Sequence, residues 1–163
     1  MHQLFKYFSA LLVMVLGATL FYCNSQSESS KYGQIVKGRH WEGLIVRTET
    51  IPKRKNDPAT WTASKKLVLE IEPKLHEHIL STFKDKPGYE WILGNLHDYK
   101  IQYTGFYEGD TKILAISFMH ISQVKNGEWK EPFGVLGGGQ NFFSVLYDTE
   151  KKTFSKPSVN ADA

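Results

Sequence analysis

Apolar residues recur every three or four positions in one stretch of the chain, which is typical of an amphipathic helix. The stretch covers residues 63–84, and its apolar positions are Val68, Ile71, Leu75, Ile79 and Phe83. Thr62 stands where a capping residue belongs. Pro73 lies in the middle and has no N–H to donate, which predicts a kink or a break at Glu72. The apolar positions continue in phase across Pro73, so the pattern favours one long helix with a kink over a break into two.

Alternating apolar and polar residues follow the helix, which is typical of strands. Residues 98–107 and 111–121 alternate and are joined by a tight turn, so they predict a hairpin. Residues 141–147 are apolar on both faces and predict a strand inside the sheet. A turn at 148–153, headed by an aspartate, leads into a short return strand. A further short strand is predicted before the helix, over residues 40–48.

A long helix followed by strands predicts an α+β domain. We expect one N-terminal helix packed on an antiparallel meander of about four to five strands, a cystatin-like arrangement, preceded by a signal or anchor helix. The strands carry more aromatic residues than one helix covers; these are Trp129, Phe133, Phe142, Phe143 and Tyr147. An aromatic sheet face left uncovered would mark a contact with a protein or a glycan.

The N-terminal stretch has no charge from Phe8 to Tyr22, which is fifteen residues. This is typical of a secretory signal or a membrane anchor, although a bilayer span needs about 20 residues. Cys23 follows, and then a polar stretch rich in serine. The chain therefore divides into a signal peptide or anchor over 1–23, a polar tether over 24–34 and a single domain over 35–163.

The order of leader, cysteine and tether resembles a bacterial lipoprotein leader, which makes Cys23 a candidate for lipidation. Two alternatives stay open, an uncleaved anchor and cleavage after a small residue such as Ser25. Each of them predicts an exported, membrane-associated domain in the periplasm or at the cell surface. The membrane contact would be made by residues 4–23 or by acylated Cys23.

Composition adds little to this picture. The 163 residues are 41% hydrophobic, which suffices for one domain with a real core. Twenty basic and 17 acidic residues give a net charge of +3, which is too small to predict a nucleic-acid partner. Basic residues gather between Lys31 and Lys66, where a solvated loop is the usual interpretation and a membrane-surface contact is the alternative.

No metal or cofactor is predicted. Cys23 is the single cysteine, which excludes an intramolecular disulfide and a cysteine-based metal site. His76 and His78 lie about 200° apart around a helix and cannot share an ion. The other histidines outside the leader, which are His40, His97 and His120, are far apart in sequence. Glu70 and Glu72 are expected to point apart and to be solvated.

A glycine triplet is the most unusual local feature. Its residues and the two that follow are Gly137, Gly138, Gly139, Gln140 and Asn141. Consecutive amides in such a loop can bind an anion, but neither a helix nor a Lys-Ser/Thr pair follows. A tight bend or bulge ahead of a strand is the alternative. These five residues are the candidates for ligand or partner binding.

Several of these segments occur together in a recognisable set. They are Trp61-Thr-Ala-Ser64, the helix with Glu72 and Leu75, Leu96–Gly105, Gly137–Gly139, Tyr147-Asp148, Phe154 and Val159–Ala163. The set resembles a loosely defined group of small uncharacterised bacterial exported proteins and lipoproteins, over residues 60–163. Because the group has no assigned activity, the resemblance implies an exported domain and no functional residue.

Three functions are compatible with these observations. The first is a non-enzymatic binding, accessory or inhibitor module of the cell envelope. The second is an envelope hydrolase with dispersed catalytic residues such as His97, Asp98 and His120. The third is a purely structural envelope protein, in which residues 134–141 would tolerate substitution.

Overall fold

The structure is a computed structural model, which describes residues 29–125, 127–134 and 137–161. Within these ranges a nine-stranded sheet is accompanied by two α-helices. The strands are β1 (Ser29–Ser30), β2 (Gly33–Lys37), β3 (Glu42–Val46), β4 (Thr60–Trp61), β5 (Tyr99–Glu108), β6 (Thr111–His120), β7 (Phe142–Asp148), β8 (Thr153–Phe154) and β9 (Ser158–Val159). The helices are α2 (Lys65–Phe83) and α3 (Glu90–Gly94), and the 3₁₀ turns are η1 (Thr48–Thr50), η2 (Leu96–Asp98), η3 (Ile121–Gln123), η4 (Glu128–Lys130) and η5 (Gly139–Asn141).

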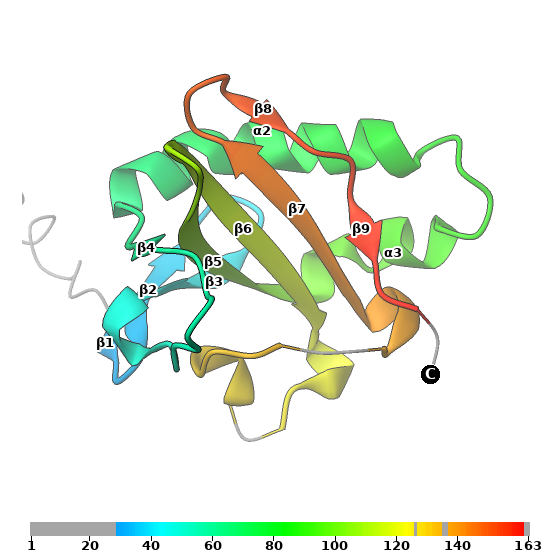
Figure 1. Ribbon diagram of the computed structural model, residues 1–163. Coiled ribbons are helices and arrows are strands. Elements are labelled where there is room, and N and C mark those ends of the chain that lie inside the picture. The colour runs from blue at the N-terminus through cyan, green and yellow to red at the C-terminus, as the bar shows by residue number, and fades with distance from the viewer. Residues whose placement is uncertain (1–28, 126, 135–136, 162–163) are drawn as a thin grey trace, which may run out of the picture.

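The sheet is antiparallel except at one strand pair. Its order is β1-β2-β3-β5-β6-β7-β8, with β4 paired to β5 and β9 paired to β7 (Figure 1). Strands β3 and β5 run parallel, with Gly43 opposite Ile101. Parallel neighbours need a crossover connection, and α2 and α3 lie in that connection.

The α+β class is confirmed, but the predicted simple meander is wrong. Four strands precede α2, so the helix is not N-terminal to the sheet. The sheet has nine strands and not four or five, although β1, β4, β8 and β9 are only two residues long. The hairpin of β5 and β6, the strand β7 and the return strand β8 were all predicted.

Strand β2 is the main element that the sequence did not predict. Residues 29–34 fall in the stretch predicted to be a tether, yet Ser29 and Ser30 pair with β2. Strand β2 in turn pairs along its length with β3. A Cβ on Gly33 would lie 2.0 Å from the carbonyl oxygen of Ile45. Glycine is therefore required at position 33, because the backbones of β2 and β3 approach too closely there for a side chain.

Helix α2 differs in detail from the prediction. Its N-cap is Ser64 and not Thr62, because the Ser64 hydroxyl accepts a hydrogen bond from the Leu67 N–H at 3.2 Å. The helix continues through Pro73, so the chain does not divide into two helices. The apolar stripe stays in phase across the proline, and its burial outweighs the loss of one backbone hydrogen bond.

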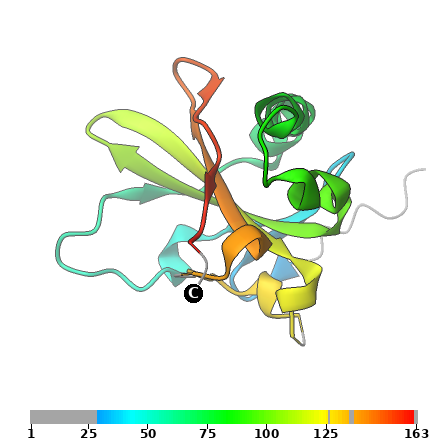
Figure 2. The ribbon, with the colours of Figure 1, turned by 90° about the vertical axis from the view of Figure 1, so that its right-hand side faces the viewer.

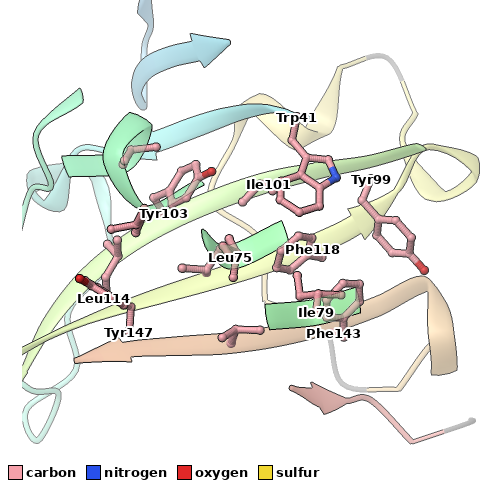
Figure 3. Close-up of a cluster of buried hydrophobic side chains, with 14 of the residues drawn as sticks. Trp41, Leu75, Ile79, Tyr99, Ile101, Tyr103, Leu114, Phe118, Phe143 and Tyr147 are labelled. Carbon is pink, nitrogen blue, oxygen red and sulfur yellow. The ribbon is translucent and has the colours of Figure 1, made fainter. Parts of the chain in front are cut away.

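The apolar stripe of α2 is buried, as predicted. Its five residues Val68, Ile71, Leu75, Ile79 and Phe83 are each at most 1% exposed. Figure 2, which looks along α2, shows both helices on one side of the sheet. The stripe packs on inward-facing side chains of β3, β5, β6 and β7, and the close-up in Figure 3 shows Leu75 and Ile79 among them. This is the larger of two buried clusters.

The second face of the sheet is covered by irregular segments. Gln102 of β5 is 3% exposed, and its Nε2 donates to the carbonyl oxygens of Trp129, at 2.9 Å, and Glu131. Its Oε1 accepts from the Phe133 N–H at 3.2 Å. One amide side chain therefore holds residues 129–133 against the sheet. Four of the five predicted aromatics are therefore buried, on two different faces. Trp129 and Phe142 lie in the cluster under these segments, whereas Phe143 and Tyr147 lie in the cluster under α2.

Candidate functional site

The glycine triplet forms a tight turn with an unusual backbone. Gly137, Gly138 and Gly139 have φ values of 87°, 86° and 54°, which favour glycine over every L-residue. A Cβ on Gly138 would also lie 2.6 Å from the ring of Phe142. The triplet leads through η5 into β7. The glycines are therefore explained by this bend, and we refer to residues 137–141 as the glycine turn.

Two amides of the glycine turn are used within the protein. The Gly139 N–H donates to the carbonyl oxygen of Ala161 at 3.1 Å, and the Asn141 N–H donates to that of Gly138 at 3.2 Å. An anion cradle needs successive amides that face the ligand. This geometry favours the tight bend over the anion site.

Contacts with distant segments hold the glycine turn in place. The Tyr99 hydroxyl donates to the carbonyl oxygen of Gln140 at 2.6 Å. The Asn160 Nδ2 donates to the carbonyl oxygen of Gly137 at 2.9 Å, and the Asn160 N–H donates to Phe142 at 3.0 Å. Burial raises the pKa of Tyr99, so its hydroxyl stays a donor. Sequence reasoning missed Tyr99 and Asn160, because 41 and 23 residues separate them from their partners.

Two hollows flank the glycine turn, and Asn160 borders both. The first has a volume of about 210 Å³ and is lined by β6, β7, Phe133 and Gly134. The second has a volume of about 340 Å³ and lies between Gln140, Val159 and the segment around Tyr89. The predicted residues Gly139 and Gln140 therefore form part of a concave surface.

One buried acceptor of the glycine turn has no hydrogen-bond partner among the described residues. Gln140 Oε1 is buried and accepts no hydrogen bond from any residue in the described ranges. Leaving such an atom unpaired costs about 1–3 kcal/mol. Unpaired polar atoms are rare in folded proteins, and each one calls for a physical explanation. Gln140 is for this reason the most informative of the five predicted site residues.

Only two of the three residues of the hydrolase hypothesis lie together. His97 Nε2 lies 3.4 Å from Asp98 Oδ2, with 76% of the His97 side chain exposed. His120 is buried, and its Nδ1 accepts from the Ser122 N–H at 3.2 Å. The His120 ring packs on Trp91, with ring centroids 4.8 Å apart. No interaction among the described residues connects His120 with His97 or Asp98, so the three side chains are not joined in one constellation.

A pair of stacked histidines lies where α2 meets the β2–β3 turn. The rings of His40 and His76 stack with centroids 3.7 Å apart and planes 5° from parallel. Burial lowers the pKa of His76, and the neighbouring His40 lowers it further. His78 stacks separately on Phe154, which fits the predicted opposite directions of His76 and His78. In the described part of the chain, no three His, Cys, Asp or Glu side chains converge as a metal site requires.

The prediction for Glu72 is wrong. Glu70 is exposed as expected, but Glu72 is only 2% exposed. Its Oε1 accepts from the backbone N–H of His40 at 2.6 Å and of Trp41 at 3.3 Å. The carboxylate is buried because it accepts hydrogen bonds from the turn between β2 and β3. The apolar pattern of the helix does not show that this turn packs against Glu72.

The predicted leader and Cys23 lie outside the described residues. In the ranges that the structure does describe, no helix combines the length and apolar character that crossing a bilayer demands. The lipidation and anchor hypotheses therefore rest on the sequence.

Comparison of this chain with protein-family models, curated proteins and solved structures finds no match.

Proposed function

We propose that this chain is an exported, membrane-tethered module that binds a polypeptide partner without catalysis. The contact surface is the glycine turn with its two flanking hollows. The observation that carries the proposal is the fixed shape of this turn, which Tyr99 and Asn160 hold through hydrogen bonds to Gln140 and Gly137. The proposal joins this surface to the leader predicted from residues 8–22.

A fixed surface is suited to binding because it is ordered before the partner arrives. Association normally costs free energy for each loop and side chain that becomes immobile. The glycine turn is already held by bonds to β5 and to the segment after β9. Little further ordering is therefore needed when a partner binds.

The size of the hollows favours side chains of a protein over a whole small molecule. Small-molecule sites usually have volumes of about 300–1,000 Å³. The first hollow, at about 210 Å³, is smaller than this range, and the second, at about 340 Å³, is at its lower end. Interfaces are dominated by a few anchoring side chains in such depressions. Two anchoring side chains of the partner, one in each hollow beside Asn160, match this geometry.

Gln140 indicates which chemical group the partner should present. Its buried Oε1 accepts no hydrogen bond from the described residues. A turn of the Gln140 side chain into the second hollow would bring this atom within reach of a donor on the partner, such as a backbone N–H or an amide side chain. The partner therefore gains from presenting a donor beside the side chain that enters the second hollow.

The experiment uses a photo-crosslinking amino acid in the full-length chain in native membranes. Gly134 borders the first hollow, is exposed, and a Cβ there meets nothing within 4 Å. Gly94 of α3 is exposed with equally free space but does not line either hollow, so it is the matched control. We expect a discrete adduct from Gly134 and none from Gly94.

A second variant tests the role of the acceptor. Gln140→Leu removes Oε1 and keeps a similar volume, so it should weaken the Gly134 adduct about tenfold through the lost hydrogen bond. The same crosslinked adducts from positions 134 and 94, or no adduct from either position, would contradict the proposal. Full tolerance of substitutions over residues 134–141 would instead favour a purely structural protein.

A further inference from the structure

We propose that the end of the domain at which the chain enters from the tether binds the headgroups of anionic lipids. The surface consists of Lys31, Arg47, Lys53, Arg54 and Lys55, and we call it the basic edge. The inference deepens the proposed function, because it rests on anchoring through residues 4–23 or Cys23. It adds a second contact that orients the domain on the membrane.

Charge is distributed unevenly along the chain. Residues 29–59 hold seven basic and three acidic residues, a net charge of +4. Residues 60–163 hold twelve basic and thirteen acidic residues, a net charge of −1. The positive charge of the protein is therefore concentrated in the first strands and the loop that follows them.

The fold places Lys31, Arg47 and the start of the loop that carries the other cations at the point of entry. The sheet begins at Ser29, and the Arg47 N–H donates to the carbonyl oxygen of Tyr32 at 2.8 Å. The Thr50 hydroxyl reaches the same carbonyl oxygen at 3.4 Å. Arg47 and the start of the 52–59 loop therefore lie beside Lys31, two residues after Ser29. Figure 2 shows this loop projecting from the body of the protein.

The basic edge is free to bind. Lys31, Arg47 and every residue of 52–59 are exposed. In the described ranges, none of the five cations forms an ion pair, and Lys31 lies over the ring of Tyr32 at 5.1 Å. Two carboxylates lie nearby, those of Glu49 and Asp57, and Asp57 accepts the Arg54 N–H at 2.7 Å. Five cations against two carboxylates leave a net charge of +3.

Lipid headgroups fit this surface better than nucleic acid. Basic residues that adjoin a membrane segment are attracted to anionic lipids, by a factor of about five for each residue. The uncharged run Phe8–Tyr22 ends only seven residues before the sheet begins at Ser29. A tether this short keeps the basic edge close to the bilayer, within reach of the surface potential.

The test uses the full-length chain with an environment-sensitive fluorescent amino acid incorporated in place of Asn56, so that Cys23 is kept. Asn56 lies in the exposed loop. The protein is reconstituted in vesicles of phosphatidylcholine, alone or with about a quarter phosphatidylglycerol. We expect a blue-shifted, brighter signal only in the anionic vesicles, reversed by about 0.5 M salt.

Matched variants separate this contact from general charge. Lys53→Gln, Arg54→Gln and Lys55→Gln together should lower the docked-to-free ratio about tenfold or more. Lys84→Gln with Lys86→Gln removes two exposed lysines after α2 and should leave the signal unchanged. Equal signals in both vesicle types, or an equal response of the protein to duplex DNA, would overturn the inference. Flotation with phosphatidylcholine vesicles reports the anchor separately, so failure of the tether is distinguishable from failure of the basic edge.

Discussion

The carboxylate of Glu72, in the middle of α2, accepts a hydrogen bond from the backbone N–H of His40 at 2.6 Å. The bond joins the helix to the turn between β2 and β3, 32 residues earlier. The same oxygen accepts from Trp41, and a Cβ on Gly38 would lie 2.9 Å from the carboxyl carbon. The turn is therefore shaped around this side chain.

We predict that Glu72→Ala lowers the free energy of unfolding by about 2–4 kcal/mol, because two N–H groups lose their acceptor. Glu72→Gln keeps a carbonyl oxygen at the same place and should cost less. Glu77→Ala, at an exposed position of the same helix, is the control and should change stability by about 0.5 kcal/mol or less. Urea unfolding measures all three variants, and equal losses for Ala at positions 72 and 77 would contradict the role of Glu72.

Stability should fall as the pH is lowered past the ordinary pKa of histidine. The fold lowers the pKa of His76, through burial and then through His40, so the folded state favours the neutral ring. This contribution is present above the unfolded pKa of about 6.5 and is lost as the pH falls through the folded pKa. His76→Phe keeps a ring against His40 and removes the titration.

The measurement is urea unfolding of wild type and His76→Phe between about pH 7 and 5. The difference between the two proteins separates the effect of His76 from that of carboxylates with lowered pKa values. One of these is Glu42, whose pKa is raised by burial but lowered more by Lys100, Lys37 and Lys130 together. His97→Gln removes an exposed histidine outside this stacked pair and serves as the control. A wild-type slope retained in His76→Phe would refute the assignment.

Gly138→Ala should destabilise the glycine turn. Gly138 has φ of 86°, where an L-residue costs about 1–2 kcal/mol, and the added Cβ would collide with Phe142. We expect a loss of about 2 kcal/mol or more in thermal or urea unfolding, together with a weaker crosslink from Gly134. Gly134→Ala meets no neighbour within 4 Å and serves as the control. Comparable stability of the two variants would show that the turn is not held as described.

Gln102→Glu should release the segment that covers the second face of the sheet. The substitution keeps the shape but places a carboxylate oxygen against the carbonyl oxygens of Trp129 and Glu131. We expect a loss of about 3 kcal/mol or more at neutral pH. Amide exchange at Phe133 should accelerate, since its N–H loses a fixed acceptor. Gln123→Glu, on the exposed η3, should change neither quantity.

The local pattern of apolar and polar residues was sufficient to predict the main helix and the long strands of the second half of the chain. The spacing of Val68 to Phe83 identified the buried face of α2. Alternation identified β5 and β6, and apolar residues on both faces identified β7, each within one or two residues. These features depend on periodicity, which neighbouring residues determine by themselves. The glycine turn was also visible in the sequence, because three consecutive left-handed residues require glycine.

What only the tertiary structure decided was which distant segments meet. The parallel pairing of β3 with β5, the burial of Glu72 against His40, and the support of Gln140 by Tyr99 join residues 32 or more positions apart. Such contacts depend on chain topology and leave no periodic trace in either segment. For the same reason the sequence showed a cluster of basic residues, whereas only the fold showed that Arg47 lies beside the point where the chain enters the sheet.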